Sequence, residues 1–238
     1  MIKKFILISL LSGFISALGL TALQLFNTIP LILEAEKYEN NNLINYDTSK
    51  QIINKNHIED DEKYQWFPEN GFERTIYTFI SNFVLSVGFS LILLSVYLYI
   101  NSITIIKGIF TGFIGYLVFF LLPNMGLPAE LPGTVASSLD NRQIWWIGTV
   151  VISFVGFTII FFNKNKVLRI VAIFLILLPH IITAPHALIH AGRAPYEMLK
   201  HFEINSTITN GIFWIILSFV TIILFKKYNI KENKDYEI

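Results

Sequence analysis

Residues 75–100 read TIYTFISNFVLSVGFSLILLSVYLYI, a run of 26 positions without a charged side chain. An α-helix needs roughly 20 apolar residues to cross a bilayer core about 30 Å thick, so this run is long enough. Because lipid offers no partner for backbone N–H and C=O groups, a segment inside it must be helical. The stretch predicts a membrane-spanning helix, and the rest of the chain repeats the pattern.

The composition of the whole chain agrees with a membrane protein. Hydrophobic residues make up 53% of the 238 positions and charged residues only 15%, and phenylalanine alone occurs 21 times. An average soluble domain carries roughly 25% charged residues. A soluble globule would not keep so little charge and so much aromatic surface, so soluble enzyme folds are excluded.

Six apolar runs can be counted along the chain. We expect an all-α, polytopic membrane protein with about six transmembrane helices, forming a single integral membrane domain over residues 1–238. The first run extends well past the ~7–15-residue apolar region of a signal peptide, so we expect it to be retained as a helix. The predicted spans are about 5–33, 75–100, 103–122, 144–162, 167–184 and 207–225.

The distribution of charge predicts the orientation. An even number of spans puts both termini on one side, and ten of the 18 Lys and Arg residues then share that side with only three of the 17 Asp and Glu residues. Such an excess of positive charge is typical of cytoplasmic segments. We therefore expect a multi-pass protein of the cytoplasmic (inner) membrane with both termini in the cytoplasm. The first outer segment, about 37–70, is Asn-rich and is expected to be a flexible loop.

Several kinds of chemistry have no support in the sequence. The chain has no cysteine, which excludes disulfides, Fe–S clusters and thiolate sites. It also has no phosphate-binding loop, serine nucleophile elbow or H-E-x-x-H motif. The basic residues are scattered at membrane edges, which gives no indication of nucleic-acid binding. We expect the protein not to be an enzyme.

A proline lies near the outer end of each outward-going span: Pro30, Pro123 and Pro179. Proline removes a helical hydrogen bond and kinks the helix. Interrupted helices at corresponding positions can indicate a transporter site, although proline is also common near the ends of membrane helices.

The histidines are the strongest candidates for metal ligands. His186 and His190 are four residues apart, so on a helix both imidazoles could reach one divalent ion. Pro185 and Pro195 bracket the segment, and an interfacial polar role fits these two histidines equally well. His180 lies within the fifth apolar run, where a titratable group is a functional candidate by default.

Carboxylates add to this outer set. Glu34 and Glu36 leave the first span at the outer surface, where they would concentrate cations by electrostatic focusing. With no cysteine available, imidazole and carboxylate are the strong ligands that this chain can offer to Zn, Ni, Co or Fe(II).

The outer segments carry several specific strings. In chain order they are PLILEAEKYE at 30–39, GFERT at 71–75, GLPAELPG at 126–133, RQIWW at 142–146, and Pro179-His180 followed by Ala184-Pro185-His186 and His190. Together these strings resemble the CbtA family of predicted cobalt transporter subunits. The resemblance covers nearly the whole chain. Relatives often carry a His-rich or acidic first outer loop. Here that loop is Asn-rich, and His57 is its only histidine.

The resemblance implies cobalt uptake across the cytoplasmic membrane, in connection with cobalamin synthesis. It also implies a small single-span partner of the CbtB type, besides the lipid bilayer and the metal ion itself. No cofactor is expected to be bound permanently, and cobalt(II) or nickel(II) is the expected transported ion, because the same ligands bind both metals.

A working mechanism assigns a role to each candidate. Glu34, Glu36 and Glu130 attract a hydrated divalent cation, His186 and His190 coordinate it, and His180 passes it to a path between the spans. Two other hypotheses stay open: a membrane redox subunit that binds haem through His180 and a second histidine, and an assembly subunit that transports nothing.

Overall fold

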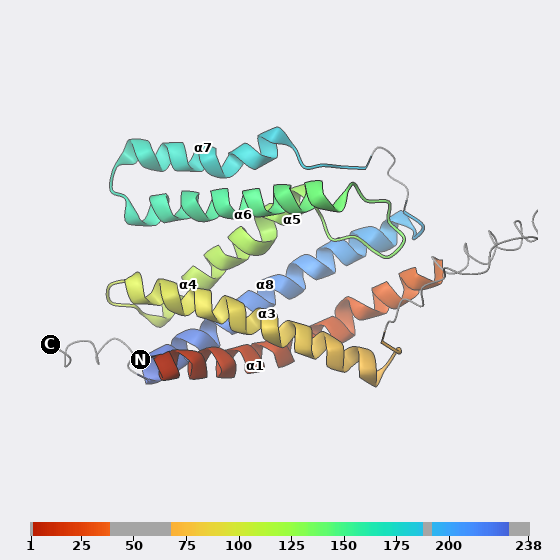
Figure 1. The fold of residues 1–238 in the computed structure, drawn as a ribbon, viewed down its shortest axis with the longest axis horizontal. Helices are drawn as coiled ribbons and strands as arrows, with labels where there is room; N and C mark the ends of the chain where they lie inside the picture. The colour runs from red at the N-terminus through yellow and green to blue at the C-terminus, as the bar shows by residue number, and fades with distance from the viewer. Residues whose placement is uncertain (1, 39–67, 188–191, 229–238) are drawn as a thin grey trace, which may run out of the picture.

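The computed structural model describes residues 2–38, 68–187 and 192–228, and the regular structure in these ranges is entirely helical, which confirms the all-α prediction (Figure 1). Residues 29–38 form a further helix directly after the first one. The other elements are α1 (Ile2–Asn27), α3 (Phe72–Tyr99), α4 (Ile105–Tyr116), the π-helix η1 (Leu117–Leu121), α5 (Leu122–Gly126), α6 (Leu139–Phe162), α7 (Lys166–Ile182) and α8 (Tyr196–Lys227).

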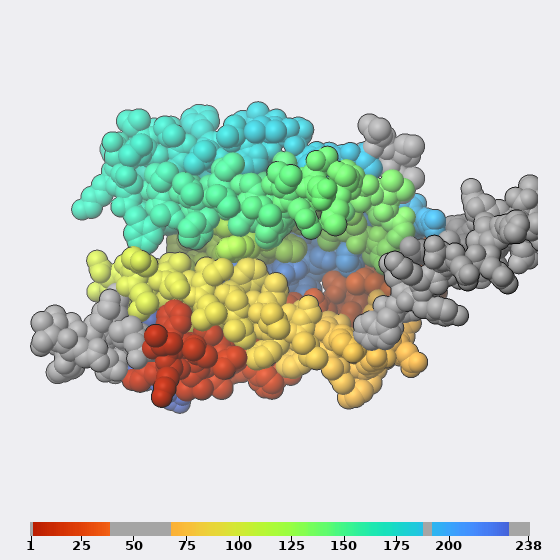
Figure 2. Space-filling view, in the orientation of Figure 1, coloured from red at the N-terminus to blue at the C-terminus, as the bar shows by residue number. Residues whose placement is uncertain are grey.

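The helices form two layers. Helices α1, α3 and α8 pack together, α4 packs along α8, and α6 and α7 form an antiparallel hairpin. In Figure 2 the α6–α7 hairpin lies above the α1–α3 pair, and parts of α4 and α8 are visible in the hollow between them. Helix α8 is thus the central element, since it contacts α1, α3 and α4.

The connections separate into two ends of the bundle, and the ends of the described chain lie together (Figure 1). Lys4 Nζ donates to the carbonyl oxygen of Tyr228 at 3.4 Å, and the short turns 100–104 and 163–165 lie at the same end. Segments 127–138, 183–187 and 192–195 lie at the opposite end, which we call the outer end (Figure 1). This partition agrees with the predicted one, while the side of the membrane that each end faces stays a prediction.

Five of the described helices are long and apolar enough to cross a membrane, against the six predicted: Ile2–Asn27, Phe72–Tyr99, Ile105–Gly126, Leu139–Phe162 and Tyr196–Lys227. The remaining predicted span, 167–184, corresponds to α7, which has only 17 residues. At 1.5 Å per residue it rises about 26 Å, less than the ~30 Å hydrocarbon core. Its outward side chains are nonetheless apolar, with Phe174 and Ile181 66% and 70% exposed, and a sixth crossing stays a prediction.

Two of the prolines interrupt their helices. The predicted span 5–33 breaks at Thr28, because Pro30 lacks an N–H and its ring would clash with the carbonyl of Phe26. Before Pro123 the helix widens into the π-turn 117–121, where the N–H of Leu122 bonds to Leu117 five residues back. Pro179, by contrast, lies inside α7.

Two other predicted boundaries differ. The sixth span was predicted to begin at 207, but α8 begins at Tyr196. The first turns of α8 contain several polar residues, so a count of apolar residues does not include them. The predicted flexible loop 37–70 lies mostly outside the described residues, and its first two positions continue the helix 29–38.

Small residues set the distances between helices. A Cβ added to Gly13 would lie 2.5 Å from Val87 on α3, and one added to Gly112 would lie 2.2 Å from Ser218 on α8. One added to Gly156 would lie 2.5 Å from Ile176 on α7. Close approach through small residues is the usual way in which membrane helices associate, because lipid removes the hydrophobic driving force between them.

Candidate functional site

Four segments meet at the outer end of the molecule. Leu131, in the irregular segment 127–138, packs with Ala35 of the helix 29–38 and with Phe202 of α8. Ser137 Oγ donates to the carbonyl oxygen of Pro185 at 2.8 Å, which ties the same segment to the chain after α7. The segment therefore lies across the outer ends of the helices that carry the predicted site residues.

Glu130 is held by an arginine. Its Oε2 lies 2.8 Å from Arg142 Nη2 at the start of α6, and the two side chains are 32% and 28% exposed. This ion pair joins the GLPAELPG and RQIWW strings. A carboxylate in such a pair has its charge balanced, so a cation would have to compete with Arg142 for it.

His180 lies in the last turn of α7 and contacts Trp145 edge to face, with ring centroids 6.1 Å apart. Its Nε2 is buried and has no hydrogen-bond partner among the described residues, and the same holds for Nε1 of Trp145. The indole ring also covers Gly126, where an added Cβ would lie 2.2 Å from Trp145. Three of the strings that resemble the family thus converge on Trp145.

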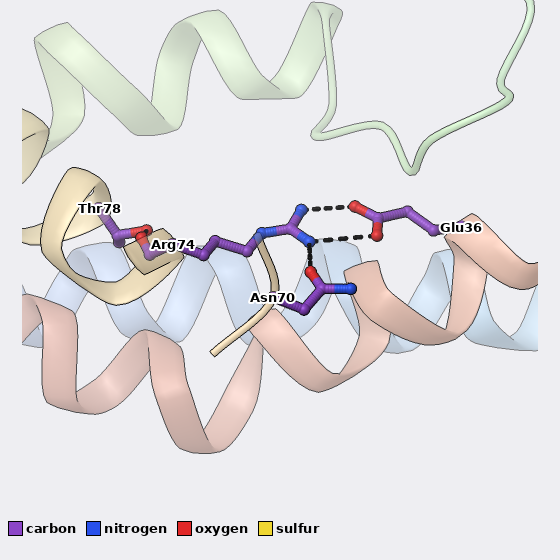
Figure 3. Close-up of polar contacts among 4 residues, drawn as sticks. All are labelled: Glu36, Asn70, Arg74 and Thr78. Atoms are coloured by element: carbon purple, nitrogen blue, oxygen red, sulfur yellow. Dashed lines mark hydrogen bonds and ion pairs between the residues drawn. The ribbon is translucent and has the colours of Figure 1, made fainter. Parts of the chain in front are cut away.

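Glu36 is paired as well, with Arg74 of α3 (Figure 3). The guanidinium donates from Nη2 to Oε1 at 2.5 Å and from Nη1 to Oε2 at 3.1 Å. Nη1 also donates to Asn70 Oδ1 at 2.6 Å. Glu34, two residues earlier, is exposed. Arg74 was not among the predicted site residues, because its pairing with Glu36, 38 residues away in the chain, depends on how two helices meet.

The second histidine pair does not have the assumed geometry. His186 is exposed and lies in the irregular stretch 183–187, where Thr183 has a φ of +66°. The helical spacing that was assumed to bring His186 and His190 to one ion is therefore wrong at His186. His190 itself lies outside the described residues.

Among the described residues, no group of three or more His, Asp or Glu side chains is placed to hold a metal ion. Glu36 and Glu130 contact arginines, Glu34 and His186 are exposed, and His180 is set back against α6. The metal set of His180, His186, His190, Glu34, Glu36 and Glu130 therefore stays a prediction.

A shallow groove of about 440 Å³ lies between α5 and the first turns of α8. Its polar lining includes Asn124, Lys200, Glu203 and Thr207, and its apolar lining includes Met125. Lys200 Nζ lies 2.8 Å from Glu203 Oε2. None of the five predicted metal residues that the structure describes lines the groove.

The chain matches a known protein family. The family model described as "Probable cobalt transporter subunit (CbtA)" matches residues 2–226, nearly the whole chain. No curated protein and no solved structure matches the chain.

Proposed function

Because the chain belongs to the CbtA family of probable cobalt transporter subunits, we propose that it forms the path by which cobalt(II) enters the cell across the cytoplasmic (inner) membrane. The observation that carries this proposal is the convergence of three family-like strings on Trp145 and His180 at the outer end. The family description names a transporter subunit, which makes a metal ion and at least one partner subunit part of its function.

The route begins at the most accessible ligands. Glu34 and His186 are exposed and can meet a hydrated cation first. Glu36 and Glu130 become available only as they leave their arginines, so they act after this first contact. His180 lies deeper, and its buried Nε2 has no partner in the described ranges. It is the natural next ligand, since a neutral imidazole nitrogen binds cobalt or nickel.

The membrane potential can drive the movement. A dication that moves inward through 100 mV, inside negative, gains about 4–5 kcal/mol. We propose that the chain performs transport rather than catalysis, with both termini in the cytoplasm. Its partner would be a small single-span subunit of the CbtB type, and the imported metal would serve cobalamin synthesis.

Uptake of radioactive cobalt tests the proposal, in cells that lack their own cobalt and nickel importers. The chain is expressed with and without its partner. A triple variant, His180→Ala, His186→Ala, His190→Ala, is compared with the control His201→Ala, which changes an exposed histidine on α8. We expect the triple variant to lose most uptake and His201→Ala to keep it. Absence of uptake by the unaltered chain with its partner would contradict the function, while equal uptake by both variants would contradict the histidine assignment only.

A further inference from the structure

Polar side chains line the interface of α1 and α3 over most of its length. Six of them, which we call the polar seam, are buried there: Ser12, Ser16, Thr21, Asn82, Ser86 and Ser90. On α3 the spacing is four residues, which keeps the side chains on one face of the helix. From Ser12 to Thr21 the seam runs about 14 Å along the helix axis at 1.5 Å per residue.

The two ends of the seam are hydrogen-bonded layers. At the outer layer Asn82 Nδ2 donates to Thr21 Oγ1 at 3.0 Å and to Gln24 Oε1 at 2.6 Å. At the inner layer the hydroxyl oxygens of Ser12 and Ser90 are 2.7 Å apart, and that of Ser90 is 3.3 Å from Thr221 on α8. These contacts fix the antiparallel register of α1 and α3, and the register places Ser16 opposite Ser86.

The middle layer contains an unsatisfied group. Ser16 is 0% exposed, yet its hydroxyl has no partner among the described residues. Its neighbours Ser12 and Ser86 each donate to the carbonyl oxygen four residues back, at 2.6 Å. The hydroxyl of Thr209, which is buried on α8, also has no partner in the described part of the chain. Buried polar groups are nearly always hydrogen-bonded, so the missing partner of Ser16 needs an explanation, and a water molecule fits one inside a continuous line of polar side chains.

The seam leads to the Glu36–Arg74 ion pair. Arg74 and Thr78 continue the four-residue spacing of α3 outward from Asn82, and Thr78 Oγ1 donates to the carbonyl oxygen of Arg74 at 2.8 Å (Figure 3). The charged pair bridges α3 and the helix 29–38, so it lies at the outer end of the seam.

We propose that the polar seam is a hydrated path for the transported cation, closed at its outer end by the Glu36–Arg74 pair. Its side chains offer hydroxyl and amide oxygens and no carboxylate or imidazole. Such groups hold the water shell of a dication loosely, which conduction requires, because an ion that binds too tightly does not leave. The inference rests on the proposed transport function and adds the route within the membrane.

The alternative is that the seam is dry and only holds the helices together, as polar groups in membrane bundles often do. The two possibilities differ in whether water reaches the side chains of the seam. Because the chain has no cysteine, a single Ser→Cys substitution creates the only thiol in the protein. A thiol reacts as its thiolate, which forms in contact with water and is suppressed in apolar surroundings.

The experiment measures how fast Ser16→Cys and Ser86→Cys react with a small hydrophilic methanethiosulfonate in proteoliposomes. Two matched controls are used. Ser153→Cys lies on α6, off the seam, where the serine hydroxyl is also buried and has no partner among the described residues, and Ser95→Cys lies on the exposed side of α3. We expect both seam thiols to react at least about tenfold faster than both controls, and excess cobalt(II) to slow them.

Seam thiols that react as slowly as Ser153→Cys would overturn the path. The two seam positions lie on different helices, so if one variant does not insert, the other decides. Labelling needs no transport, and this separates the two proposals. Slow labelling in a protein that still takes up cobalt contradicts the path alone, whereas fast labelling without any cobalt uptake contradicts the transport function.

Discussion

Glu36 and Arg74 are 38 residues apart in the chain, and their contact joins the continuation of the first helix to α3. Each side chain is roughly a quarter exposed, so water weakens the attraction without cancelling it. The bidentate geometry makes this pair stronger than a typical surface ion pair. Loss of one partner leaves the charge of the other partly buried and without a counter-charge.

We expect Arg74→Ala to lower the stability of the detergent-solubilised protein by about 1 kcal/mol, and Glu36→Ala by a similar amount. The double variant should be no worse than either single one, because the shared interaction is lost only once. Thermal unfolding followed by tryptophan fluorescence measures this cycle. Glu34→Ala is the control and should change little, and fully additive losses would contradict the pairing.

Trp145 supports His180 on one side and Gly126 on the other. We expect Trp145→Ala to cost about 3–5 kcal/mol, because it leaves a cavity between α5, α6 and α7. Trp145→Phe keeps an aromatic ring against His180 and should retain most cobalt uptake, whereas Trp145→Ala should lose it. Uptake is normalised to the amount of inserted protein. Equal uptake by both variants would show that the ring does not position His180.

The sequence could predict individual site residues only where a local signal existed. His180 could be found because an imidazole within an apolar run is unusual, and Trp145 because it lies in a specific string. The arginine partners of Glu36 and Glu130 could not be found in this way. Both pairs depend on how separate helices meet, and no local pattern encodes that meeting.

Helix packing depends on glycines that differ sharply in their surroundings. An added Cβ at Gly112 would collide with Ser218, while at Gly88 on α3 it would meet nothing within 4 Å. We therefore expect Gly112→Ala to push α4 from α8 and to cost about 1–3 kcal/mol. Gly88→Ala is the matched control and should stabilise by up to about 1 kcal/mol. Thermal unfolding compares the two, and a stable Gly112→Ala protein would contradict this packing.

The hydropathy pattern was sufficient to predict the existence of the helices, since long apolar runs in a membrane leave few alternatives. It could not predict where they end. The first turns of α8 contain Glu197, Lys200 and Glu203, so the helix there rests on the burial of Phe202 rather than on continuous apolarity. The π-turn before Pro123 is a local change in the backbone hydrogen-bonding pattern, and the hydropathy of the residues does not predict it.

At the scale of the whole molecule, the ends of the described chain and the two short turns lie at one end of the bundle. Fusions to alkaline phosphatase, which is active only outside the cytoplasm, test the predicted sides. We expect activity after Pro132 and none after Asn163. A fusion after Pro185 reports on α7 alone, because it is active only if that short helix crosses the membrane. Activity after Asn163 would contradict the predicted orientation.

Helix α8 has 32 residues and is therefore about 48 Å long, some 18 Å longer than the hydrocarbon core. We expect its lysines at 226 and 227 to mark one membrane edge, which would leave the surplus length extending from the outer face into water. Charges placed there act on ions through salt solution, in which attraction fades over about 8–10 Å. The capture of dilute cobalt should therefore weaken as the ionic strength of the medium rises, even though passage through the membrane interior is shielded from it.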